Sequence, residues 1–262
     1  MTRQSGGKPT TGSALARAAL RMLVWCCVCL TCSCAQKSVE RFTIGPVRGP
    51  QNVYRAAESL PPDMKRVAVL PVAVTAGDSA LEDGKQALEP VLYAELRKTS
   101  RFEIMEVTAE QMRSLTGQSQ WSAQEKLPPD FLKHVQAMAN CDAVLFSRLT
   151  HYRAYPPLII GWDLKLVDVK TSSIFWAVDE VFDASNPLVN NAARLHALAQ
   201  APETSAPADS RTIFNSPRRF GQFSASQVTA TLPERKLVLA KVPAQHADKQ
   251  AEQKEASPQP RP

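Results

Sequence analysis

The chain of 262 residues is long enough for one or two domains, and its 44% hydrophobic and 21% charged residues are typical of a globular protein. Its formal net charge is +6, but residues 1–33 hold four of the 31 basic residues and no acidic one, which leaves 27 basic against 25 acidic residues in the rest. No basic stripe or RNA-binding aromatic motif follows, so the composition argues against nucleic acid as a partner.

Residues 1–33 have the three-part pattern of an export signal. A positively charged region ends at Arg21, a short apolar core runs from Met22 to Thr31, and small residues follow. This core is too short for a membrane-spanning helix, which needs about 20 apolar residues. We therefore expect a signal peptide over residues 1–33.

The end of this signal resembles the lipobox of bacterial lipoproteins. In the stretch LTCSC, residues 30–34, the small residue Ser33 precedes Cys34. This order predicts that Cys34 carries lipid (palmitate) and anchors the chain to a membrane. Thr31 stands where an aliphatic residue is usual, so a plain signal peptide or an uncleaved anchor remains an alternative.

The remaining cysteines do not predict a metal site. Cys29 and Cys32 form a C-x-x-C, but no such pair lies outside residues 26–34, and the four histidines are scattered along the chain. Cys141 precedes an apolar run, which favours a buried structural thiol over a nucleophile. No metal or other cofactor is expected.

The first predicted elements follow a stretch with several Pro and Gly residues, 34–64, which we expect to be a flexible tether. Residues 65–74, KRVAVLPVAV, are apolar on both faces, as in a central buried strand. Apolar residues then recur at helical spacing over 80–99. Pro90 interrupts this pattern, so we expect a kink there or a regular helix that starts there.

Alternating strands and helices fill the rest of a domain predicted over residues 65–232. Helix starts are marked by a capping box at Thr108 and by the pairs Asn186-Pro187 and Ser216-Pro217. Strands are expected at 101–107, 142–152, 155–169 and 173–184, helices at 108–115, 128–139, 187–199 and 217–232, a loop at 200–212, and a disordered tail at 233–262. The order β-α-β-α-α-β-β-β-α plus a final helix predicts an α/β (α+β) fold, in which helices pack on a mixed sheet of about five strands.

Four segments of the chain resemble the CsgG/LpoB-like group of periplasmic lipoproteins, which includes the curli-secretion lipoprotein and an activator of peptidoglycan synthases. They are RVAVLPV, LEPVLYAELRKTSRFEIMEVTAEQM, ANCDAVLFSRLTHY and WDLKLVDVKTSSIFW. The resemblance covers residues 65–185 and implies an α/β domain. The loops at 108–130 and 150–157 are too short for the membrane-inserted hairpins of the secretion member, so a channel is not expected.

The sequence contains none of the common catalytic motifs, and no catalytic residue is assigned. Asp179 and Asp183 lie near Glu180 and share one strand face, which is an arrangement that binds a cation or supports hydrolysis. The alternative interpretation is a solvated or salt-bridged edge.

The stretch THYRAYPPL predicts contact with a protein partner through His151, Tyr152, Arg153 and Tyr155, because Tyr and Arg are favoured interface anchors and the prolines stiffen the loop. Alternatively, the tyrosines cover the sheet edge. In SPRRF, two arginines begin a helix, where positive charge opposes the helix dipole, so an acidic partner inside or outside the chain is expected to compensate.

Together these features favour a non-enzymatic adaptor or activator in bacterial cell-envelope assembly. It would be anchored by lipid to the outer membrane, on the side that faces the periplasm, and would bind an unidentified periplasmic protein. One alternative is a component of a secretion or surface-appendage assembly, which implies a homo-oligomer. The other is an envelope enzyme with an unrecognised site at Asp179 and Asp183.

Overall fold

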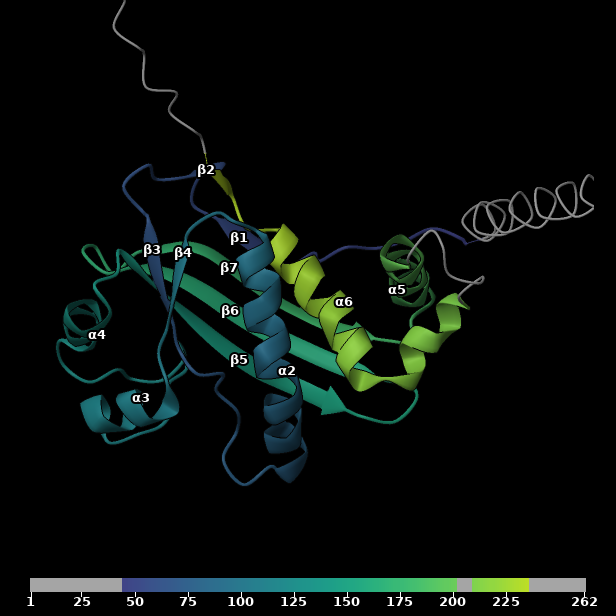
Figure 1. The fold of residues 1–262 in the computed structure, drawn as a ribbon, viewed down its shortest axis with the longest axis horizontal. Coiled ribbons are helices and arrows are strands. Elements are labelled where there is room, and N and C mark those ends of the chain that lie inside the picture. Colours follow the sequence, from purple (N-terminus) through teal and green to yellow (C-terminus); the bar gives the residue numbers. More distant parts are fainter. Residues whose placement is uncertain (1–43, 202–208, 236–262) are drawn as a thin grey trace, which may run out of the picture.

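A six-stranded mixed sheet forms the centre of the computed structural model, which describes residues 44–201 and 209–235 (Figure 1). The strand order is β1-β7-β6-β5-β3-β4; β3 pairs in parallel with β4 and β5, and the other pairs are antiparallel. The strands are β1 (Val53–Arg55), β3 (Arg66–Val69), β4 (Glu103–Glu106), β5 (Ala143–Arg153), β6 (Ile159–Asp168) and β7 (Ile174–Asp183). The predicted mixed α/β fold is confirmed, with one strand more than expected.

Helices cover the two faces of the sheet unequally. One face packs against α2, α5 and α6, whereas α3 and α4 cover only the part of the other face formed by β3, β5 and the end of β6 (Figure 1). The helices are α2 (Ser79–Lys98), α3 (Ala109–Thr116), α4 (Phe131–Ala139), α5 (Pro187–Gln200), the 3-10 helix η1 (Ser210–Asn215) and α6 (Pro217–Ala230). None of these helices, in the part of the chain that is described, is long and apolar enough to cross a membrane.

Two buried tryptophans attach α6 to the sheet. The Trp162 indole N–H donates to Ser224 Oγ at 3.0 Å, and that of Trp176 donates to Thr231 Oγ1 at 3.0 Å. A buried indole N–H without an acceptor is costly, so each hydroxyl both satisfies a donor and sets the position of α6. This explains why a helix so late in the sequence belongs to the core.

The prediction of a flexible tether is wrong for residues 44–64, because these residues pack on the domain. Here β1 is an edge strand paired with β7, and Leu60 and Met64 are buried in the core. Arg48 forms an ion pair of 2.5 Å with the buried Glu180, which also accepts from the backbone N–H of Gln51 at 2.7 Å. The predicted signal peptide and residues 34–43 lie outside the described residues.

Two further segments differ from the prediction. Glu234–Arg235, placed in the disordered tail, form strand β8 and pair in parallel with β2 (Ser59–Leu60). The predicted loop at 200–212 contains the start of η1, with Asp209 accepting from the backbone N–H of Arg211 at 2.9 Å. The rest of the predicted tail, 236–262, lies outside the described residues.

Local signals for helix starts are confirmed. Thr108 and Gln111 form the predicted capping box, and Asn186 and Ser216 cap α5 and α6. The regular part of α2 does not start at Pro90, because α2 begins eleven residues earlier and continues through that proline.

Close contact between α2 and α6 depends on Gly221. A Cβ atom at this position would lie 2.3 Å from Leu88 Cδ2, and Leu88 is fully buried. The absence of a side chain therefore allows the two helices to approach each other over the sheet.

Gly221→Ala is expected to destabilise the protein although alanine favours helix by about 1 kcal/mol. Overpacking against Leu88 costs about 1–3 kcal/mol and outweighs that gain. Urea unfolding measures the change in the free energy of unfolding. In the double variant with Leu88→Ala the added methyl group has room, so the two costs should be less than additive; full additivity would contradict the contact.

Candidate functional site

The β5–β6 hairpin carries the residues predicted to bind a partner, and the structure divides them. His151, Arg153 and Tyr155 are exposed, whereas Tyr152 is half-buried against Gly84 of α2. Burial raises the pKa of Tyr152, and the charge of Asp83 adds to this. Tyr152 therefore holds the hairpin on the domain, and the other three side chains face outward.

Tyr155 is 79% exposed at the tip of this hairpin. Arg153 Nε donates to the Pro157 carbonyl at 2.6 Å, which closes the loop below Tyr155. Next to the tip lies a hollow of about 350 Å³ lined by Pro156, Pro157, Leu158, Ala184, Asn190 and Phe214. We call the three exposed side chains and this hollow the hairpin surface. Sequence reasoning missed the hollow because its lining comes from three distant segments.

The predicted acidic group is not brought together as one site. Glu180 points to the opposite face of the sheet and pairs with Arg48, and Asp183 accepts from the backbone N–H of Ser185 at 2.8 Å. Asp179 lies directly opposite Asp163 on the neighbouring strand. The salt-bridged alternative therefore holds for Glu180, and Asp183 has a local role at the end of β7.

Asp163 is a buried carboxylate that the sequence did not single out. It accepts from Gln124 Nε2 at 2.7 Å, and Lys165 Nζ lies 3.7 Å from its other oxygen. Burial raises the pKa of Asp163, as does the charge of Asp179, against the opposing effect of Lys165. The folded chain thus binds a proton on Asp163 more tightly than the unfolded chain does.

Cys141 is confirmed as a buried thiol. It is 2% exposed and packs in the core beneath α3 and α4. Burial raises its pKa, because the thiolate would lose its hydration. A thiol with a raised pKa and no access to solvent does not serve as a nucleophile.

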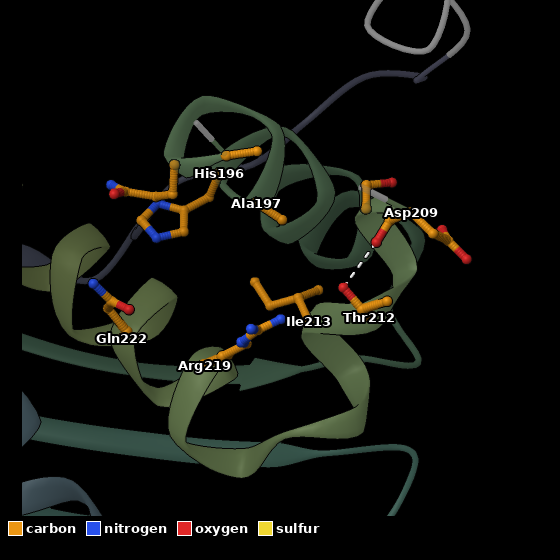
Figure 2. Close-up of a pocket in the computed structure, with 10 residues that line it drawn as sticks. His196, Ala197, Asp209, Thr212, Ile213, Arg219 and Gln222 are labelled. Carbon is orange, nitrogen blue, oxygen red and sulfur yellow. Dashed lines mark hydrogen bonds between the residues drawn. The ribbon is translucent and has the colours of Figure 1, made fainter. Parts of the chain in front are cut away.

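A cavity of about 450 Å³ lies between α5, η1 and α6 (Figure 2). His196 stands on its α5 wall, and Arg219 extends from α6 across the cavity towards Ile213 (Figure 2). The rest of its lining is Ala197, Gln200, Ala201, Asp209, Ser210, Thr212 and Gln222. We call it the Arg219 pocket. Its one signal in the sequence is the pair of arginines after Ser216-Pro217.

His196 is half-buried in this wall. Its Nδ1 lies 3.5 Å from Ser226 Oγ, and its ring contacts Phe223 edge to face. Burial lowers the pKa of His196; Glu95 opposes this and Lys98 adds to it. The imidazole is therefore neutral at pH 7. Across residues 44–201 and 209–235, no group of three or more His, Cys, Asp or Glu side chains is placed to hold a metal ion.

No family model matches the chain, and no curated protein matches it. Similar solved structures include the PelC dodecamer from Paraburkholderia phytofirmans, with 14% identity and a TM-score of 0.35 over 67% of this chain and 94% of that one. They also include lipoprotein GNA1162 from Neisseria meningitidis, with 16% identity and a TM-score of 0.33 over 45% and 79% of the two chains.

A third similar structure is the LpoB C-terminal domain from Escherichia coli, with 18% identity and a TM-score of 0.29 over 45% of this chain and 82% of that one. The structural neighbours thus include one bacterial lipoprotein and an LpoB domain. At scores of this size, the likenesses carry no argument about function, which rests on the residues of this chain.

Asp163→Asn is expected to raise the free energy of unfolding at pH 7, because it removes a buried charge while the amide oxygen still accepts from Gln124. Ionisation of Asp163 lowers stability as pH rises through its raised pKa, so the gain should shrink as pH falls towards 4. Urea unfolding at pH 7 and pH 4 measures both effects. Asp179→Asn, at an exposed position, serves as a control with a smaller gain. A loss of stability for Asp163→Asn at pH 7 would show that the buried charge of Asp163 does not destabilise the fold.

Proposed function

We propose that this protein is a non-enzymatic adaptor or activator in bacterial cell-envelope assembly, anchored by lipid on Cys34 and bound to a periplasmic protein through the hairpin surface. The observation that carries the proposal is the exposure of Tyr155, 79%, beside an apolar hollow. A large aromatic side chain left in water next to such a hollow is typical of an interface anchor.

In the hairpin surface, the projecting side chain of Tyr155 stands on a loop that is already fixed in position. Tyr152 packs on α2, and the Arg153–Pro157 hydrogen bond closes the loop. Little conformational freedom is then lost when a partner binds, and this loss is one of the main costs of association. His151 and Arg153 add polar contacts at the rim.

The proposed location rests on the N-terminal sequence. The short apolar core, the small residue Ser33 and the following cysteine support export and lipid attachment, and we place the protein on the outer membrane, facing the periplasm. The partner is then a protein that reaches the space next to this membrane.

Replacing Tyr155 with a photo-crosslinking phenylalanine analogue is expected to give a discrete crosslinked adduct in native membranes, because this side chain would lie inside the interface. Immunoblotting and mass spectrometry detect the adduct. Tyr54 is a matched control, since it is also an exposed tyrosine, 54%, but lies on β1. Adducts of equal yield at both positions, or at neither, would overturn the proposed surface.

The lipid anchor is tested separately. Cys34→Ser, or treatment of cells with globomycin, is expected to accumulate the unprocessed precursor, because lipoprotein signal peptidase requires the lipidated cysteine. Mass spectrometry of the mature N-terminus should find acyl groups on Cys34. Normal processing in both cases, without acyl groups, would show that an ordinary signal peptide is cleaved.

A further inference from the structure

Several hydrogen-bond donors that line the Arg219 pocket have no acceptor among the described residues. The guanidinium of Arg219 extends into the cavity (Figure 2). Arg219 and Gln200 are exposed and Gln222 is half-buried, and none of the three forms a side-chain hydrogen bond with residues 44–201 and 209–235. Arg219 contributes five N–H donors and no acceptor. The side chains facing the cavity therefore favour a ligand that supplies acceptor oxygens.

Acidic groups near the cavity are already engaged. Asp209 accepts from the backbone N–H of Arg211 and caps η1, and Glu95 forms an ion pair of 2.5 Å with Lys98. Neither arginine at the start of α6 belongs to an ion pair formed by the described residues. The acidic partner expected for Arg218 and Arg219 is thus not supplied by this part of the fold.

We propose that the Arg219 pocket binds a carboxylate. The two carboxylate oxygens match the planar fork of Arg219, which binds such groups through two parallel N–H···O bonds. Gln222, one helical turn further along α6, donates to the same group. His196 faces it from α5 (Figure 2). A cavity of about 450 Å³ is within the range of small-ligand sites and also admits an acidic side chain of a peptide.

The test uses the full chain in a non-ionic detergent and two carboxylate probes, with affinity measured by calorimetry at pH 7. Glutarate represents a free small molecule, and the capped dipeptide acetyl-Glu-Glu-amide represents an acidic protein segment. Glutaramide, the neutral analogue of glutarate, controls for shape. Proton NMR of the His196 ring reports whether the bound probe lies in the cavity.

Arg219→Gln is expected to weaken the tighter probe about tenfold or more, because the charged fork is lost. Arg219→Lys should weaken it by a smaller factor, since charge remains without the fork. The matched control is Arg218→Gln, which removes the same charge from the same helical turn but does not line the cavity, and should change affinity less than about twofold. Thermal unfolding confirms that each variant is folded.

Tighter binding of glutarate than of the dipeptide identifies a free carboxylate as the ligand, and the reverse order identifies an acidic protein segment. Equal weakening by the Arg218 and Arg219 variants would overturn the site, because it would show surface charge attraction. The site would also be overturned if glutaramide bound as tightly as glutarate, or if the His196 signal did not change. A third such result is that neither probe binds to the natural chain or to the variant Glu203→Gln, which removes the one acidic residue within 202–208. Crosslinking through Tyr155 is independent of all these outcomes.

Discussion

Parallel pairing of β3 on both sides is the constraint on which the rest of the structure depends. A strand buried on both faces and bonded to β4 and β5 in parallel needs crossover connections, since hairpins join only antiparallel strands. The connection from β3 to β4 runs through α2 on one face, and that from β4 to β5 runs through α3 and α4 on the other. The start of β3 is held by Asp142, whose carboxylate accepts from the backbone N–H groups of Lys65 at 2.8 Å and Arg66 at 2.9 Å. Burial opposes the ionised form, yet these bonds keep the pKa of Asp142 below its ordinary value.

The unequal lengths of the strands determine where the hairpin surface and the Arg219 pocket lie. β3 has four residues, whereas β5 has eleven, so the strands of the meander extend well past the parallel part of the sheet. The extended half is covered by α5, α6 and the start of α2, and the tip of its β5–β6 hairpin is exposed at Tyr155. The Arg219 pocket and the hairpin surface both lie in this half, next to α5, η1 and the start of α6.

Features with a local physical cause could be predicted from the sequence, and features made by distant pairing could not. The caps at Thr108, Asn186 and Ser216 depend on side chains within three residues, so their patterns were sufficient. β1 was missed because it is a three-residue edge strand whose partner lies about 120 residues later, and its Arg48–Glu180 support has no local signal. For the same reason the exposed tyrosine and the paired arginines were noticed, but the hollow and the cavity beside them were not.

If Cys34 is lipidated as proposed, the packing of residues 44–52 on the domain limits how far the domain can stand from the membrane. Asn191 of α5 donates to the Pro46 carbonyl at 3.0 Å, and the adjacent Asn190 lines the hollow of the hairpin surface. If Cys34 carries the lipid, ten peptide steps join it to Ile44, and a fully extended chain of this length spans roughly 36 Å at most. A tether that reached from Cys34 to residue 64 would span up to roughly 110 Å. The hairpin surface would then be presented close to the lipid headgroups, so a partner would have to offer its binding element next to the bilayer rather than deep in the periplasm.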